Sequence, residues 1–189
     1  MNNILSEKEY QRFIIDKLVS ENGYIERKNV KFDRKFAIDC EMLFKFLDDT
    51  QPEAMAQIRK VYKDVTEDTV VNFINTEITK AKSSLLSVLK HGVEIAGYKL
   101  DLMYTKPATT FNKDLLAKYN KNIFSVMEEV WASDTERIDL VVFLNGFAIM
   151  SFELKCNFAG QSYQDAILQY RTLRNPKTRM FYFIAGGIG

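Results

Sequence analysis

Two apolar segments joined by Asn145-Gly146 restrict the fold of this chain more than any other pattern in it. Residues 137–144 and 147–155 both contain runs of aliphatic and aromatic side chains. An Asn-Gly pair between such segments is the strongest short-range signal for a β-hairpin, because both residues tolerate the left-handed backbone of a tight turn. The sequence therefore predicts two antiparallel strands in the interior of a sheet.

Three charged side chains interrupt this apolar hairpin: Asp139, Glu153 and Lys155. Glu153 and Lys155 are two residues apart on a strand, so both leave the same face while Leu154 points into the core. Two carboxylates suit a divalent cation, whose remaining ligands would be the Leu154 carbonyl, water and a phosphate oxygen. Lys155 would orient an attacking water and offset developing negative charge. The pattern is typical of metal-dependent phosphodiester hydrolysis, and a structural ion pair is the alternative.

The same acid-x-Lys spacing occurs twice more, at Glu26/Lys28 and Asp33/Lys35. Both of these pairs lie in polar, charge-rich stretches, where a solvated loop is the simplest interpretation. Only Glu153 ends a run that is apolar enough for an interior strand. Buried charges must be paired or must bind something, so context favours this third pair as the functional one.

The register of the hairpin tests this interpretation. A plain two-residue turn would place Asp139 opposite Phe152 and direct its side chain away from Glu153. The two carboxylates can reach one metal only if a three-residue loop or a β-bulge in either strand restores the parity. We therefore predict that the hairpin is not a plain two-residue turn.

Helical periodicity dominates the first half of the chain, and strand patterns dominate the second. Ser6 and Glu9 have the spacing of a capping box, and Asn22-Gly23 ends the helix that they begin. Further helices are expected near residues 42–47, at 52–62, at 67–89 in one or two pieces that stop near Gly92, at 113–119 and after Gly160. Further strands are expected at residues 93–95, 98–104, 123–131 and 179–185.

Composition excludes several classes of site. The chain holds one histidine, His91, and two cysteines, Cys40 and Cys156. A zinc site with several cysteines is therefore excluded, and any histidine-dependent triad would have to use His91. Two unpatterned cysteines indicate free thiols in a reducing compartment. With neither a secretory leader nor a long apolar run, the sequence predicts a cytoplasmic protein with no membrane partner.

Basic residues gather towards the end of a chain whose formal net charge is only +1. After Glu153 there is one acidic residue, Asp165, and five basic ones: Lys155, Arg171, Arg174, Lys177 and Arg179. One interpretation is that these basic residues are ordinary surface charges. The other is that, because they cluster beside a carboxylate pair, they form a face that binds a phosphate backbone.

Residues 137–147 and 151–155 resemble the N-terminal nuclease domain of the R (restriction) subunit of type I restriction-modification enzymes. The likeness continues in order along nearly the whole chain, so it is far more specific than the acid-x-Lys spacing. It includes Ser6-Glu7, Asn22-Gly23-Tyr24, Asp33-Arg34-Lys35, Thr50-Gln51-Pro52, His91-Gly92-Val93, Lys106-Pro107-Ala108, Gly160-Gln161, residues 165–171 and Arg174-Asn175-Pro176. Residues 127–129, Met-Glu-Glu, depart from the Arg-Gln that relatives tend to carry.

The resemblance implies a restriction-endonuclease-like PD-(D/E)xK fold of mixed α/β class, with a central mixed sheet flanked by helices and a helical insertion in the first half. It implies Mg²⁺-dependent cleavage of double-stranded DNA, with Mn²⁺ as a substitute. Asp139, Glu153 and the Leu154 carbonyl would be metal ligands, and Lys155 would be the catalytic lysine. Residues that would support DNA binding or cleavage are Glu7, Gln169, Tyr170, Arg171 and Arg174.

The resemblance also implies the extent and the partners of the domain. One nuclease domain is expected over residues 1–189, with a helical portion at about 37–91 and a catalytic core at about 1–30 and 92–185. Expected partners are double-stranded DNA, the helicase/translocase domains of the same full-length subunit, and the modification and specificity subunits. No G-x-x-x-x-G-K-[ST] motif occurs, so ATP is expected only in the full-length subunit. A catalytically silent DNA-binding or assembly module with the same fold is the alternative.

Overall fold

A six-stranded mixed sheet forms the centre of the computed structural model, which describes residues 6–80, 83–155, 163–168, 172, 174, 175 and 177–184. The strand order is β1-β6-β7-β8-β3-β2. β1 runs parallel to β6, and every other neighbouring pair is antiparallel. The strands are β1 (Ile25–Arg27), β2 (Phe32–Asp33), β3 (Ile38–Asp39), β6 (Phe124–Trp131), β7 (Arg137–Leu144) and β8 (Phe147–Phe152).

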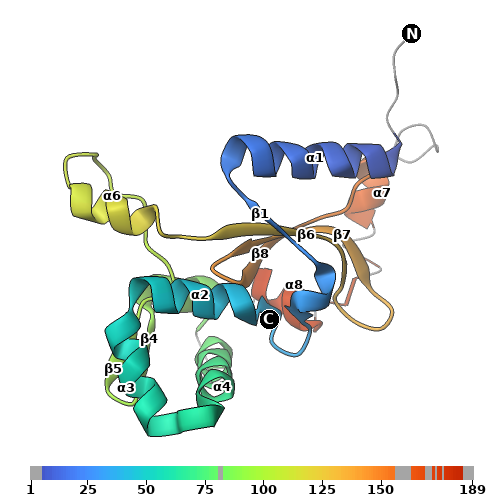
Figure 1. Cartoon of the computed structure of the whole chain (residues 1–189). Helices are drawn as coiled ribbons and strands as arrows, with labels where there is room; N and C mark the ends of the chain where they lie inside the picture. Colours follow the sequence, from blue (N-terminus) through green and yellow to red (C-terminus); the bar gives the residue numbers. More distant parts are fainter. Residues whose placement is uncertain are drawn as a thin grey trace.

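Helices cover both faces of this sheet (Figure 1). α1 (Glu7–Asn22) packs on one face, where Ile15 joins Val126 and Leu140 in a small apolar cluster. α8 (Arg179–Ile184) contacts β8 and contributes to the main core on the other face. The mixed sheet between helices confirms the predicted fold class.

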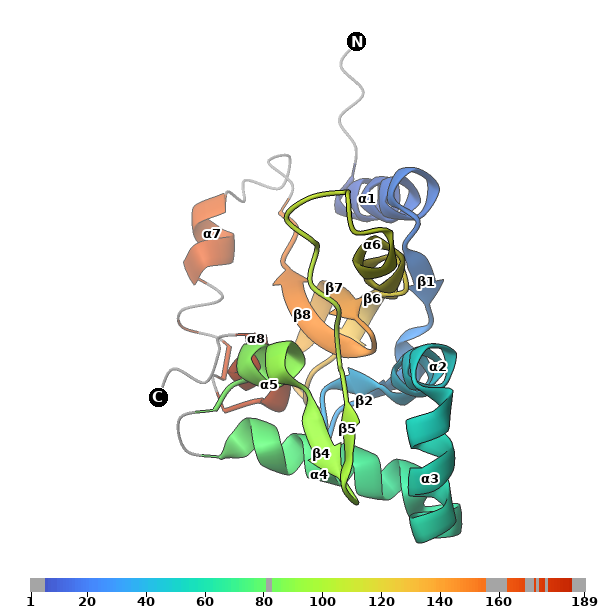
Figure 2. The same ribbon diagram turned by 90° about the vertical axis from the view of Figure 1, so that its left-hand side faces the viewer.

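The helical insertion lies between β3 and β4. Its helices are α2 (Cys40–Thr50), α3 (Pro52–Tyr62), α4 (Thr66–Thr79) and α5 (Leu85–His91), with a short 3₁₀ turn at Lys63–Val65 between α3 and α4. Another 3₁₀ turn, Asn29–Lys31, follows β1. The chain continues into a separate two-stranded sheet of β4 (Val93–Ile95) and β5 (Tyr98–Leu100). This small sheet packs on α3 and α4 rather than extending the central sheet (Figure 2).

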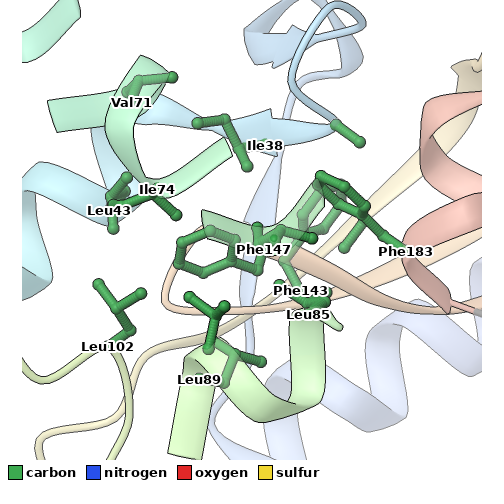
Figure 3. Packing of buried hydrophobic residues seen from close by; sticks show 14 of the residues in the cluster. Ile38, Leu43, Val71, Ile74, Leu85, Leu89, Leu102, Phe143, Phe147 and Phe183 are labelled. Carbon is green, nitrogen blue, oxygen red and sulfur yellow. The ribbon is translucent and has the colours of Figure 1, made fainter. Parts of the chain in front are cut away.

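The insertion and the central sheet share one apolar core. Phe143 and Phe147, which flank the hairpin turn, are fully buried. They pack in the same cluster as side chains of α2, α4, α5 and α8 (Figure 3). The labelled members from these helices are Leu43, Val71, Ile74, Leu85, Leu89 and Phe183. The insertion therefore helps to fix the hairpin that carries Asp139 and Glu153.

Most predicted elements are confirmed at their predicted positions. The Ser6 hydroxyl accepts a hydrogen bond from the Glu9 N–H at 3.3 Å, and the Glu9 carboxylate accepts one from the Ser6 N–H at 2.7 Å, which completes the capping box of α1. The predicted long helical segment is two helices, and its second piece ends at Gly92 as expected. α6 (Lys113–Tyr119) has the predicted bounds.

Three predicted elements are wrong in type or length. The predicted strand at 179–185 is the helix α8, which buries Met180, Phe181 and Phe183. Short apolar runs are compatible with a strand or a buried helical turn, and packing against β8 decides for the helix. Predicted strands 147–155 and 98–104 end earlier, at Phe152 and Leu100.

The helix predicted after Gly160 is described only as α7 (Tyr163–Leu168), on which Ile167 and Leu168 are exposed. The other positions of its predicted apolar stripe lie outside the described side chains. Among the described residues, no helix combines the length and the apolar character that crossing a bilayer requires.

Candidate active site

A β-bulge in the hairpin brings the two predicted carboxylates together. The turn itself has two residues, and both have left-handed backbones, with φ of 49° at Asn145 and 86° at Gly146. Next to the turn the ladder pairs Phe143 with Ala148, but beyond the bulge it pairs Val142 with Met150. Ile149 is the extra residue. Continuing this register places Glu153 directly opposite Asp139, so the bulge satisfies the prediction that the hairpin is not a plain two-residue turn.

Contacts across the end of the hairpin confirm that Asp139 and Glu153 are close. The Leu154 N–H donates a hydrogen bond to Asp139 Oδ2 at 2.7 Å. The Glu153 side chain is only 1% exposed. Burial raises the pKa of the Glu153 carboxyl, and the Asp139 charge raises it further, while Arg174 and Lys155 act in the opposite direction. Asp139, Glu153 and Lys155 therefore form one electrostatic cluster.

Arg174 is an additional member of this cluster. Its guanidinium forms an ion pair with the Glu153 carboxylate and donates a hydrogen bond to the Arg137 carbonyl at 2.9 Å. It also lies over the Phe181 ring, 6.0 Å from the centroid, and the side chain is 8% exposed. Sequence reasoning grouped Arg174 with residues that follow a phosphate backbone, whereas the structure places it inside the site.

The comparisons with known proteins identify the family. The family described as type I restriction enzyme R protein N terminus matches residues 4–188. The chain belongs to this family. The match confirms the resemblance seen in the sequence. No curated protein and no solved structure gives a significant match.

A buried acid holds the segment that carries Arg174 in this R-protein N terminus. The Glu136 carboxylate accepts hydrogen bonds from the Asn175 N–H at 2.7 Å, the Thr178 hydroxyl at 2.5 Å and the Ser133 hydroxyl at 3.2 Å. These bonds tie the loop before β7 to the residues on either side of Lys177. Sequence patterns did not single out Glu136, because its partners lie about forty positions away in the chain.

Glu136 should make the stability of the domain depend on pH. Burial by itself raises the pKa of this carboxyl, but the bonds from Thr178, Asn175 and Ser133 outweigh it and lower the pKa overall. Because the pKa is lower in the folded state than in the unfolded state, ionised Glu136 stabilises the fold at neutral pH. This stabilisation is lost as the pH falls through the folded-state pKa. Glu136→Gln should therefore lower the free energy of unfolding by about 1–3 kcal/mol at pH 7.

The measurement is urea unfolding of both proteins between pH 7 and pH 3. The two stabilities should converge at acid pH, because the unaltered chain then loses the charged hydrogen bonds that the variant already lacks. A constant difference across this range would show that the charge of Glu136 is not what holds the segment.

The structure places the other predicted residues on neighbouring elements or does not describe them. Glu7 lines a hollow of about 500 Å³ together with Gln11, Glu128 and Arg137, at the start of α1. Arg179 donates a hydrogen bond to Asn75 of α4, and Lys177 is exposed. Gln169, Tyr170 and Arg171, like Cys156, lie outside the described residues. Their predicted roles stay predictions.

The donor set suits a hard cation with few protein ligands. Among the described residues, no group of three or more His, Cys, Asp and Glu side chains is arranged to hold a metal. Asp139 and Glu153 supply two adjacent carboxylates, and like charges held this close favour a cation beside them. Mg²⁺ is usually held by one or two carboxylates plus water and substrate phosphate. The residues therefore fit Mg²⁺ or Mn²⁺.

Proposed function

We propose that this R-protein N terminus is a metal-dependent endonuclease domain that hydrolyses phosphodiester bonds of double-stranded DNA within a type I restriction-modification complex. The observation that supports this most strongly is the bulge at Ile149, which sets Asp139 opposite Glu153. With Lys155 two residues later, these side chains have the composition and spacing of a PD-(D/E)xK site.

Each residue has a defined role in this proposal. Asp139, Glu153 and the Leu154 carbonyl would hold Mg²⁺ or, in its place, Mn²⁺. When bound there, the cation would supply Lewis-acid polarisation of the scissile phosphate and favour deprotonation of the attacking water. The Leu154 N–H fixes one oxygen of Asp139 and so orients that carboxylate. Lys155 orients the attacking water and offsets the charge that develops on the phosphate.

The wider assembly belongs to the same proposal. The partners are duplex DNA, the helicase/translocase domains of the full-length subunit, and the modification and specificity subunits. ATP acts on the motor of the full-length subunit, and the complex works in the cytoplasm. Cleavage by this domain depends on that assembly, so metal binding is the sharper test of the site in this chain.

The test is Mn²⁺ binding, measured by isothermal titration calorimetry and by the electron paramagnetic resonance signal of free Mn²⁺. The unaltered chain should bind Mn²⁺ at one site. Asp139→Asn and Glu153→Gln should each weaken binding at least about 100-fold, since even residues that only support a ligand change metal affinity about 10–100-fold. Glu26→Gln is the matched control, because Glu26 belongs to an acid-x-Lys pair but forms a surface ion pair with Arg12.

One observation favours the second candidate, a silent DNA-binding or assembly module. Arg174 already neutralises Glu153, as a structural ion pair would. Under this alternative the unaltered chain binds no Mn²⁺, and its DNA affinity is the same with and without the metal. A filter-binding or anisotropy titration with duplex DNA, with and without Mn²⁺, separates the two functions.

A further inference from the structure

The pairing of β6 with β7 is interrupted next to Asp139. Pairs run regularly from Phe124/Leu144 to Glu128/Leu140, and they resume at Val130/Ile138. The pair between them, Glu129 with Asp139, is missing from this ladder. Glu129 has a left-handed backbone with φ of 54°, which is uncommon for a residue other than glycine. The strand is therefore distorted at the position facing a proposed metal ligand.

The backbone hydrogen bonds between β6 and β7 also change at this position. Before the interruption the Asn145 N–H bonds the Ile123 carbonyl at 2.8 Å, and beyond it the Ala132 N–H bonds the Glu136 carbonyl at 2.8 Å, so the alternation of backbone groups toward β6 changes across Glu129 and Asp139. Backbone carbonyls at such a change need donors, because an unpaired buried one costs about as much as a lost hydrogen bond.

Two side-chain amides bond backbone carbonyls at this interruption. Gln11 of α1 donates from Nε2 to the Asp139 carbonyl at 2.8 Å and lies 3.4 Å from Glu128 Oε2. Asn29, in the 3₁₀ turn after β1, donates from Nδ2 to the Glu129 carbonyl at 3.1 Å. Gln11 is only 4% exposed, although α1 is otherwise largely polar and exposed. Its burial serves this contact.

We propose that Gln11 is a positioning residue for metal binding by Asp139, an inference that rests on the proposed function. Asp139 is held at two points: Gln11 holds its backbone carbonyl, and the Leu154 N–H holds its carboxylate. The first contact fixes where the residue stands in the distorted strand, and the second fixes where its side chain points. Loss of the first lets Asp139 return toward regular pairing and move away from Glu153.

The test is the Mn²⁺ affinity of Gln11→Met, which keeps the size of the side chain but removes the donor. Affinity should fall about tenfold, as is typical for residues that orient a metal ligand. Asn29→Ala is the matched control, because it removes the other amide of the same strand break without touching Asp139. It should leave the affinity within about twofold, and circular dichroism should show both variants folded.

A second variant separates hydrogen bonding from packing. Gln11→Lys restores a donor of similar reach and should bring the Mn²⁺ affinity back to within about threefold of the unaltered chain. If Gln11 only filled space, Gln11→Met should be tolerated better than Gln11→Lys, because a buried ammonium is costly. Unchanged affinity in Gln11→Met, or loss in Gln11→Lys as large as in Gln11→Met, overturns the role of Gln11 while the proposed function stands. Absence of Mn²⁺ binding by the unaltered chain overturns both.

Discussion

Gly146→Ala should lower the free energy of unfolding by about 3–5 kcal/mol, because the added methyl group would meet backbone on the neighbouring strand and helix. A Cβ at this position would lie 2.4 Å from the Asp39 carbonyl oxygen and 2.8 Å from the Leu43 nitrogen. Overpacking against atoms that cannot turn aside costs about 1–3 kcal/mol or more, and a left-handed residue with a side chain costs about 1–2 kcal/mol further.

The same close approach carries a hydrogen bond that joins the hairpin to β3. The Asp39 N–H donates to the Gly146 carbonyl at 2.8 Å, and the buried Asp39 carboxylate caps α2 through the Met42 N–H and pairs with Arg27. Displacing the turn therefore loosens the start of the insertion as well. The loss should appear in urea unfolding as a lower midpoint with an unchanged slope.

Gly23→Ala is the matched control for this substitution. Gly23 ends α1 with φ of 71°, but a methyl group added there would meet nothing within 4 Å. Only the backbone strain of about 1–2 kcal/mol should remain. Equal losses in the two variants would mean that the contact of the turn with Asp39 and Leu43 does not limit stability.

The elements that the sequence predicted correctly are those that local chemistry decides. The capping box at Ser6, the stop at Gly92 and the turn at Asn145-Gly146 each depend on a few consecutive residues. The strand predicted at 179–185 failed for the complementary reason. Its aromatic residues suit a strand or a buried helix equally, and only the surface of β8 decides between them.

The register of the hairpin could be predicted only in part. Asp139 and Glu153 can share one face only if the hairpin contains an extra residue, but the sequence did not show whether this residue lies in a longer loop or in a β-bulge. The structure selects a bulge at Ile149, whose side chain packs against the apolar clusters on both faces of the sheet. Such a position depends on residues far apart in the chain, which no local pattern reveals.

Gln11 and Glu136 were missed for the same reason, and the pairing of Arg174 with Glu153 was not predicted, although Arg174 was named as a supporting residue. Gln11 reaches Asp139 across 128 positions, Glu136 reaches Thr178 across 42, and Arg174 reaches Glu153 across 21. Gln11 and Glu136 look like ordinary polar residues in their own segments. The signal that singles them out is burial of a polar side chain, which appears only once the fold is known.

Arg174→Met should destabilise the metal-free domain by about 3–5 kcal/mol, because it removes the guanidinium that pairs with the Glu153 carboxylate, whose side chain is only 1% exposed. The loss should be visible in thermal unfolding with a chelator present. Lys177→Met, an exposed basic residue on the same segment, should change stability by less than about 0.5 kcal/mol. Adding Glu153→Gln to Arg174→Met should recover much of the loss, since the buried side chain at position 153 is then neutral and no longer needs the guanidinium.

Metal provides the decisive comparison, because Arg174 and a bound cation neutralise the same carboxylate. In the unaltered chain Mn²⁺ would compete with the guanidinium for Glu153, whereas in Arg174→Met this competitor is gone. Mn²⁺ at 100 times its dissociation constant adds about 2.7 kcal/mol to a folded protein that alone binds it. The stabilisation by a given Mn²⁺ concentration should therefore be larger in Arg174→Met than in the unaltered chain. Equal gains would show that the cation and Arg174 do not share Glu153.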